Sequence, residues 1–287
     1  MARDYQAIRV QPRPCGFGAE VTQLSLAAAL PEAVLAEVRR AWAAHSVLWF
    51  PDQLLSLEAL EAFTLQLGPF GEDPFIEALP DHPHIIEVRR EPGERAVNFG
   101  AAWHSDWSFQ EKPPSATLLH AKIVPPAGGD TLYADGYRAW EALSETMREL
   151  LSGLRAVHSA SLAYGPRGVL ARDHHERSMK IVVSPEAERT QTHPLVRRHP
   201  ESGRRALFVN PVYTRGIEGM ADSESQALLG FLWEHMVRDE FVYRHRWQPN
   251  MLTVWDNRCA MHFADGGYDG HRRLMHRTTV AGERPAA

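Results

Sequence analysis

The spacing of apolar residues along the chain predicts many short strands with a few helices attached. Apolar runs of strand length end at Gly, Pro, Asn or Asp, and stretches with a helical period lie between some of them. The predicted strands are 7–10, 46–50, 85–88, 116–124, 131–133, 193–198, 206–210, 241–247 and 251–255. This pattern favours a mainly β fold with flanking helices, and a jelly-roll barrel fits it best.

Four stretches are predicted to be helical. Pro31 suits the first turn of a helix over 31–44, and a second helix begins at Ser56 and ends at Gly68-Pro69. Apolar residues recur at helical spacing throughout 135–151. The fourth helix is predicted from Ser223 and Gln226, which have the spacing of a capping box.

The segment 164–192 is polar, rich in His, Arg and Glu, and lacks a steady period. It is interpreted either as a mobile flap over a functional site or as an ordinary surface loop. Because β barrels of similar length often form one domain, we expect residues 1–287 to form a single domain.

Composition narrows the class of protein. The formal charge is −5, with 31 basic and 36 acidic residues, which argues against nucleic-acid binding. The chain has no run of 18 apolar residues, and its charged N-terminus lacks the apolar core of a signal peptide. Two cysteines, Cys15 and Cys259, are too few for a disulfide framework. A soluble cytoplasmic protein is therefore expected.

The segment His104-Ser105-Asp106 is the first sign of chemistry. In an extended segment, side chains at i and i+2 share a face, so the imidazole and the carboxylate would point to one place. Neighbouring N and O ligands without cysteine suit a first-row metal such as Fe(II) in a 2-His-1-carboxylate triad. His262, after a strongly apolar strand, is the candidate third ligand, although a structural histidine would also suit that position.

A basic cluster follows this histidine at Arg272, Arg273 and Arg277. A guanidinium on a strand that returns across the barrel can hold a carboxylate through two hydrogen bonds. An ordinary basic surface patch is the alternative interpretation.

Together these motifs resemble the taurine/2,4-dichlorophenoxyacetate dioxygenase family, which depends on Fe(II) and 2-oxoglutarate. The resemblance runs from Gly18 to Arg277. It is carried by His104-Ser105-Asp106, Gly128-Gly129-Asp130-Thr131, Trp255-Asp256-Asn257-Arg258, His262 and the stretch from Arg273 to Arg277. It implies a double-stranded β-helix, which is a cupin-like jelly roll.

The resemblance also implies residue roles. His104, Asp106 and His262 would hold Fe(II) and leave three positions for 2-oxoglutarate and O2. Arg273 would pair with the distal carboxylate of 2-oxoglutarate, and the Thr131 hydroxyl would donate to it. Decarboxylation would release succinate and CO2 and drive hydroxylation of a C–H bond. Related halogenases have a small residue where this chain keeps Asp106, so hydroxylation is expected.

For the substrate, the resemblance implies a small organic anion. Arg277 corresponds to the arginine that binds the anionic end of the substrate, aided by the backbone N–H of Trp107. A sulfonate, an alkyl sulfate or an aryloxyalkanoate would suit this subsite. The alternative is that Arg277 pairs with a local acid such as Asp256 or Asp269.

Two departures from the taurine enzyme disfavour taurine itself. Asp73-Pro74-Phe75-Ile76 stands where that enzyme has His-Pro-x-Tyr, and Gly100 replaces an asparagine. A carboxylate at Asp73 would repel a sulfonate, although it could pair with a substrate amine. The candidates for a larger apolar pocket, each of which would also suit core packing, are Phe75, Ile76, Phe99, Trp107 and Phe109.

Two other functions stay open at this point. One is a metal-binding barrel without redox chemistry that serves as a small-molecule sensor or binding protein. The other is a zinc site built on Cys259 and His262. The family likeness also favours a homo-oligomer, either a dimer or a tetramer.

Overall fold

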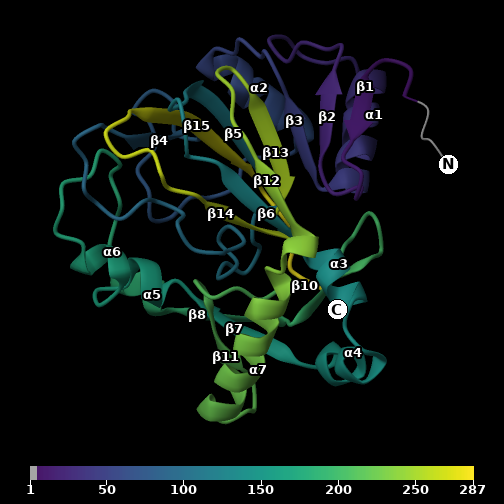
Figure 1. The fold of residues 1–287 in the computed structure, drawn as a ribbon, viewed down its shortest axis with the longest axis vertical. Coiled ribbons are helices and arrows are strands. Elements are labelled where there is room, and N and C mark those ends of the chain that lie inside the picture. Colours follow the sequence, from purple (N-terminus) through teal and green to yellow (C-terminus); the bar gives the residue numbers. More distant parts are fainter. Residues whose placement is uncertain (1–4) are drawn as a thin grey trace.

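Seven strands form the main sheet, in the order β1-β2-β3-β13-β5-β15-β4 (Figure 1). The computed structural model describes residues 5–287. Neighbouring strands pair antiparallel, except β2 and β3, which run parallel. The strands come from both ends of the chain: β1 (Arg9–Pro12), β2 (Ala19–Thr22), β3 (Val47–Phe50), β4 (Ile86–Arg90), β5 (Ala116–Ile123), β13 (Leu252–Asp256) and β15 (Arg273–Val280).

A smaller sheet faces one side of the main sheet. Its antiparallel strands, in the order β12-β6-β14, are β12 (Val242–His245), β6 (Thr131–Asp135) and β14 (Ala260–Ala264). Leu119 and Met275 from the main sheet pack in one buried cluster with Tyr133 and Ala260 from the smaller one. Two sheets packed face to face form a jelly roll, so the predicted mainly β fold class with flanking helices is confirmed.

Helices α1 (Glu32–His45) and α2 (Leu57–Leu67) lie against the other side of the main sheet, in the upper part of Figure 1. The cluster they form with the sheet includes Val38 and Trp42 of α1, Phe63 of α2, and Leu48 and Leu252 of the strands. Apolar residues at helical spacing face alternating apolar residues of the strands, so the two helices cover this side of the main sheet and exclude water from it.

A second region lies below the barrel in Figure 1. It contains the sheet β11-β7-β8 and the hairpin β9-β10. Helices α3 and α7 share its buried cluster. Its elements are α3 (Gly136–Glu141), α4 (Glu145–Ser152), β7 (Arg155–Ser159), β8 (Thr190–Pro194), β9 (Val196–Arg198), β10 (Arg205–Leu207), β11 (Thr214–Ile217), α7 (Asp222–Met236) and the 3-10 turn η2 (Asp239–Phe241).

Two helix predictions are wrong in detail. The stretch 135–151 is not one helix but α3 and α4, because each has its own cap. Asp135 Oδ1 accepts from the backbone N–H of Tyr137, and Ser144 Oγ accepts from that of Met147. The predicted capping box of Ser223 and Gln226 is also wrong. The N-cap of helix α7 is Ala221, two residues before Ser223, and it is Glu224 that accepts from the backbone N–H of Ala221.

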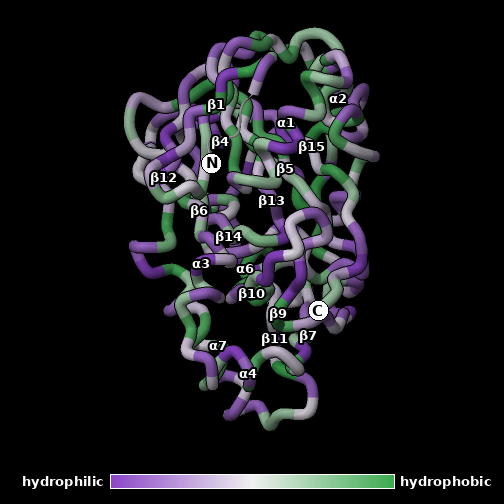
Figure 2. Tube along the Cα trace, turned by 90° about the vertical axis from the view of Figure 1, so that its right-hand side faces the viewer, coloured by the Kyte–Doolittle hydropathy of each residue, from purple (hydrophilic) through white to green (hydrophobic). Residues whose placement is uncertain are grey.

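The strand predictions are mostly right to within two residues. The predicted hairpin is present as β9 and β10, but His193 lies in β8 and pairs with Ala156 of β7. Strands β2, β7, β11 and β14 were not predicted from the sequence. Figure 2 shows hydrophilic and hydrophobic residues mixed along the trace, and none of the helices described for residues 5–287 is long and apolar enough to cross a bilayer.

Candidate active site

His104 and His262 lie side by side because their backbones form an isolated β-bridge. The N–H of His104 donates to the carbonyl of His262 at 3.0 Å, and the N–H of His262 donates back at 2.7 Å. The two ring centroids are 4.2 Å apart. One ligand atom each from His104, Asp106 and His262 lie within 4.8 Å of one another, a group that could hold a metal ion.

The Asp106 carboxylate lies on the same side as the two imidazoles. His104 forms the bridge, and a turn begins at Asp106 in which Trp107 adopts a φ of +47°. Oδ1 of Asp106 lies 3.5 Å from Nε2 of His104 and 3.9 Å from Nε2 of His262.

Hydrogen bonds hold Asp106 in place. Its Oδ2 accepts from the Thr117 hydroxyl at 2.6 Å, and its backbone N–H donates to Asn257 Oδ1 at 3.4 Å. The amide of Asn257 donates to the Thr117 oxygen at 2.9 Å, and Trp255 Nε1 donates to Asn257 Oδ1 at 3.0 Å. The Trp255-to-Asn257 part of the motif therefore supports the carboxylate. Such partners fix the orientation of metal ligands.

The protonation states suit metal binding. Burial opposes charge on Asp106, but the Arg277 guanidinium and the two histidines hold the pKa of this carboxyl well below its usual range. Burial lowers the pKa of His262 to about 3, so its imidazole is neutral. His104 Nδ1 lies 2.7 Å from the Ala102 carbonyl and donates to it, which leaves Nε2 free as a ligand. Metal ligands must be deprotonated in this way.

We expect Thr117→Val to weaken metal binding while the fold persists. Valine has the same shape but cannot donate to Asp106, so the affinity for Fe(II) should fall about 10- to 100-fold, as for other partners of metal ligands. Anaerobic titration with Fe(II) measures this change. Thr278→Val is the matched control, because Thr278 is equally buried on β15 but bonds to Thr64 of α2. Equal affinities in the two variants would contradict a role for Thr117.

Arg273 is a buried cation that has no anionic partner among residues 5–287. Its Nε makes no hydrogen bond within residues 5–287. Burial lowers its pKa, and the groups that act on it are the phenols of Tyr268 and Tyr133, not a carboxylate. The Tyr133 hydroxyl is likewise buried without a partner. These unpaired donors are what a bound carboxylate would satisfy.

Thr131 and the glycine turn before it lie in the same region. Thr131 is on β6 two residues before Tyr133, so both side chains share one face of the strand. Its oxygen accepts from Trp247 Nε1 at 3.0 Å, which leaves the hydroxyl proton free to donate. A Cβ on Gly129 would lie 3.3 Å from Arg273 Nε, so glycine keeps the guanidinium accessible.

Arg277 lies between two carboxylates. Its Nη2 is 3.3 Å from Oδ1 of Asp106 and 3.3 Å from Oδ1 of Asp73, and its guanidinium lies over the Trp107 ring. Its Nε and Nη2 are buried and make no hydrogen bond in the described part of the chain. Arg277 thus has local acids, but they are not the two expected from the sequence. Asp256 is bound by Arg258 and His199, and Asp269 pairs with Arg90.

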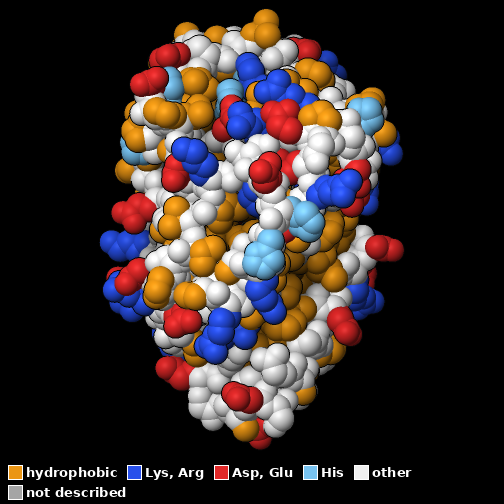
Figure 3. All heavy atoms as spheres, turned by 90° about the vertical axis from the view of Figure 1, so that its left-hand side faces the viewer, with side chains coloured by type: hydrophobic (Ala, Val, Ile, Leu, Met, Phe, Trp, Pro, Cys, Tyr) orange, Lys and Arg blue, Asp and Glu red, His pale blue; other side chains and the backbone are white. Residues whose placement is uncertain are grey.

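An apolar cavity of about 390 Å³ opens next to His104. Figure 3 shows hydrophobic side chains gathered in the lower half of the face on this side of the molecule. The lining residues come from two loops and from α5 (Ser161–Tyr164) and α6 (Val169–Arg172). They are Val97, Asn98, Phe99, Gly100, Ala101, Ala102, His104, Leu162, Ala163, Tyr164, Val169, Leu170, Pro211, Val212 and Tyr213.

Of the five residues predicted to line a larger pocket, only Phe99 borders this cavity. The others belong to a buried aromatic cluster that also holds Tyr164 and Tyr213. The Phe75 ring stacks on Tyr164 with centroids 5.0 Å apart, and Trp107 Nε1 donates to Asp73 at 2.6 Å. Phe75, Ile76, Trp107 and Phe109 therefore lie in that cluster and do not border the cavity.

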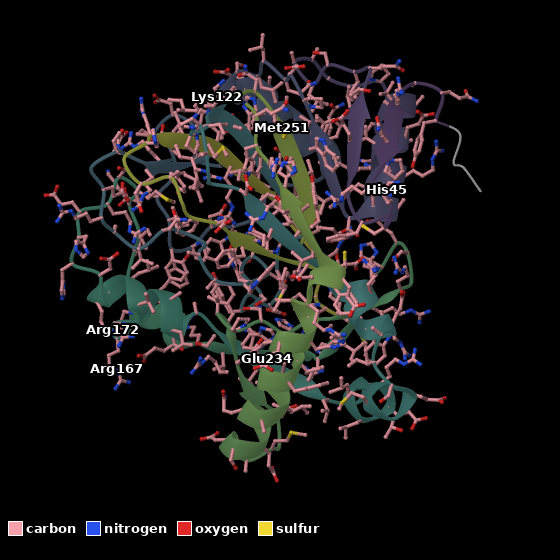
Figure 4. The ribbon with its side chains drawn as sticks, in the orientation of Figure 1. His45, Lys122, Arg167, Arg172, Glu234 and Met251 are labelled. Carbon is pink, nitrogen blue, oxygen red and sulfur yellow. The ribbon has the colours of Figure 1, made fainter. Side chains whose placement is uncertain are left out.

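The segment 164–192 packs over this side of the barrel. Asp173 accepts from the backbone N–H of Val97 at 2.7 Å, and the Ser178 hydroxyl donates to Glu94 at 2.6 Å. Met179 borders a small cavity at Arg273. The 3-10 turn η1 (Pro185–Glu188) follows. Arg167 and Arg172 point outward from this segment in Figure 4.

Sequence reasoning missed Thr117, Tyr133, Tyr164 and Tyr213. Each lies in a stretch without a recognisable motif, and only the fold brings it to the site. The zinc alternative loses support, because the Cys259 thiol lies 3.4 Å from Ser46 Oγ and burial raises its pKa. A neutral, buried thiol is a poor zinc ligand.

A jelly roll with two histidines and one carboxylate in a buried cluster is the architecture of a non-haem Fe(II) oxygenase. Residues 9–279 match the model of the taurine catabolism dioxygenase TauD, TfdA family, and the chain belongs to this family. It is accordingly a dioxygenase that depends on Fe(II) and on 2-oxoglutarate, also called alpha-ketoglutarate, with O2 as the oxidant.

Individual relatives match over nearly the whole chain. The chain is 32% identical to an alpha-ketoglutarate-dependent sulfate ester dioxygenase of Pseudomonas putida, covering 96% of this chain and 90% of that protein. It is 34% identical to an alpha-ketoglutarate-dependent 2,4-dichlorophenoxyacetate dioxygenase of Cupriavidus pinatubonensis, with 92% and 94% covered. The crystal structure of a taurine dioxygenase from Burkholderia xenovorans superposes with a TM-score of 0.82 at 32% identity, covering 98% of this chain and 92% of the other.

Proposed function

We propose that this enzyme hydroxylates a small organic anion with an apolar alkyl or aryl part, such as a sulfonate, an alkyl sulfate or an aryloxyalkanoate. Succinate and CO2 are released. The observation that carries this proposal is the position of Arg277. Its buried Nε and Nη2 make no hydrogen bond among residues 5–287, and Nη2 lies 3.3 Å from the candidate metal ligand Asp106. The apolar cavity next to His104 offers room for the rest of such a molecule.

The candidate residues divide the work. His104, Asp106 and His262 hold Fe(II), and Arg273 with Thr131 holds the distal carboxylate of 2-oxoglutarate. Bound Fe(II) and 2-oxoglutarate together activate O2 for oxidation of a C–H bond. The buried Nε of Arg273, which makes no hydrogen bond among residues 5–287, supports the second assignment.

The remaining candidates position the substrate. Arg277 and the backbone N–H of Trp107 bind its anionic group. Asp73 holds Arg277 and the Trp107 indole, and Phe75 supports Tyr164 behind the cavity wall. Because the Asp73 carboxylate lies next to Arg277, taurine, a compact zwitterion without an apolar tail, is disfavoured.

Four further properties belong to this proposal. Residues 1–287 form a single domain, which is supported by a main sheet that contains both β1 and β15. The segment 164–192 acts as a flap, which is supported by its contacts over both cavities. The enzyme works in the cytoplasm and assembles as a homo-oligomer, either a dimer or a tetramer; family likeness supports the assembly.

A succinate-release screen tests the proposed function. Sulfonates, alkyl sulfates, aryloxyalkanoates and amino acids are supplied with Fe(II) and 2-oxoglutarate to the unaltered enzyme, to Arg277→Ala and to Arg167→Ala. We expect anions with apolar tails to be the best substrates. Arg277→Ala should raise their KM about tenfold to a hundredfold, since each charge-assisted hydrogen bond contributes about 1.5–3 kcal/mol.

Arg167 is the control because it is exposed and points away from the barrel. Succinate formed without added substrate shows whether the metal site survives in each variant. A neutral best substrate together with an inert Arg277→Ala change would refute the anion assignment. Metal binding without any 2-oxoglutarate consumption would favour a non-redox barrel that serves as a sensor or binding protein.

A further inference from the structure

Asp73 and Arg277 form a buried ion pair at the place where the substrate head group is proposed to bind. Their closest atoms are 3.3 Å apart, and their side chains are only 12% and 4% exposed. Arg277 reaches this position from β15, and Asp73 from the loop before β4. An anion that approaches the guanidinium therefore also approaches a carboxylate.

The protein's own donors already occupy the Asp73 carboxylate. Oδ1 accepts from Trp107 Nε1 at 2.6 Å, and Oδ2 accepts from the Thr279 hydroxyl at 3.2 Å. The same Oδ1 faces Arg277 Nη2. Both oxygens already accept from the protein, so we place Asp73 behind Arg277 as a positioning residue that acts on the substrate through the guanidinium.

The Asp73–Arg277 pair determines the net charge that a bound substrate meets in the site. With Fe(II) and dianionic 2-oxoglutarate bound, the charges of these two groups cancel, and so do the charges of Asp73, Asp106, Arg273 and Arg277. Without Asp73, one positive charge would remain to attract a monoanion. Charges in a water-poor site interact strongly, so this difference matters for selectivity.

We propose that Asp73 sets the charge preference of the substrate subsite. By compensating Arg277, it makes the subsite bind oxygen atoms of the head group through hydrogen bonds rather than through net charge. The subsite therefore accepts monoanionic and uncharged sulfonyl or carbonyl groups attached to an apolar tail, and it rejects dianions. This inference rests on the proposed function, in which Arg277 contacts the head group.

Asp73→Asn is the test because it removes the charge and keeps the contacts. The amide oxygen still accepts from Trp107, and the amide N–H can donate to the Thr279 hydroxyl. Asp73→Glu keeps the charge with altered geometry. Asp239→Asn removes the same charge at an exposed position in η2, outside the residues of the site.

Calorimetry under anaerobic conditions then measures binding to the enzyme loaded with Fe(II) and 2-oxoglutarate. The probes are hexanesulfonate, neutral hexyl methyl sulfone, and hexyl phosphate as the dianion. The unaltered enzyme should bind the sulfonate and the sulfone within about tenfold of each other and the phosphate more weakly. Asp73→Asn should bind the sulfonate at least about tenfold more tightly than the unaltered enzyme does. Its affinity for the phosphate should rise by a larger factor, and its affinity for the sulfone should not change. Asp73→Glu keeps the charge and should show no gain for the sulfonate or the phosphate, and Asp239→Asn should behave like the unaltered enzyme.

Three results would overturn the inference: equal changes for the sulfone and the sulfonate in Asp73→Asn, weaker sulfonate binding in that variant, or no sulfonate binding by either enzyme. Turnover of anions by the unaltered enzyme without the gain in Asp73→Asn would reject this inference but leave the proposed function standing. Tighter sulfonate binding in Asp73→Asn without any succinate formation would support this inference but reject the proposed function.

Discussion

Replacing Asp106 with alanine is expected to remove both metal binding and 2-oxoglutarate turnover. The change deletes one of three candidate ligands, and it also deprives Thr117 and Arg277 of a partner. Removing a group that only hydrogen-bonds to a metal ligand lowers metal affinity about 10- to 100-fold. Removing a ligand itself should therefore lower the Fe(II) affinity by more than about a hundredfold. The metal content of the purified variant and its succinate formation measure the effect.

This variant needs a control for folding, since an unpaired buried charge destabilises a protein. Asp106→Asn keeps the acceptor for Thr117 but supplies a neutral, weaker ligand, so it should fold well and still lose iron. Asp239→Ala should keep full activity. Normal iron content and succinate formation in a folded Asp106→Ala variant would show that the metal is held elsewhere.

Replacing Arg273 with alanine is expected to raise the Kd for 2-oxoglutarate about a hundredfold or more while Fe(II) still binds. A guanidinium can give a carboxylate two charge-assisted hydrogen bonds of about 1.5–3 kcal/mol each, and every 1.4 kcal/mol is about tenfold in Kd. The Kd of Arg273→Lys for 2-oxoglutarate should lie between the values of the unaltered enzyme and of Arg273→Ala, because an ammonium keeps the charge but loses the planar pair of donors.

Arg272 is the matched control, since it is the neighbouring arginine but is half-exposed and pairs with Glu91. Calorimetric titration of each Fe(II)-loaded variant with 2-oxoglutarate separates the two positions. If Arg272→Ala and Arg273→Ala weakened binding equally, the buried guanidinium would not be the co-substrate contact.

The sequence contains much of the site because the chemistry lies in short motifs. His104, Asp106 and His262 were selected by residue type and order, and the structure brings their ligand atoms within 4.8 Å. The turn that begins at Asp106 and the positive φ of Trp107 were not predicted from the sequence.

Other features depend on contacts that no local pattern encodes. The Asp73–Arg277 pair joins a loop before β4 to the last strand, and Thr117 reaches Asp106 from the middle of the sheet. The break between α3 and α4 depends on the Ser144 cap, which competes with a continuous helical period. The local sequence allows both a continuous helix and a break, and which of them forms depends on the rest of the fold.

A single-turnover experiment tests the central claim most directly. The enzyme is loaded anaerobically with one equivalent of Fe(II) and with 2-oxoglutarate, exposed to O2, and quenched for measurement of succinate. We expect about one succinate per iron, and none from the metal-free enzyme, from the anaerobic sample or from Asp106→Ala. Succinate from the metal-free enzyme, or none from the fully loaded one, would contradict it.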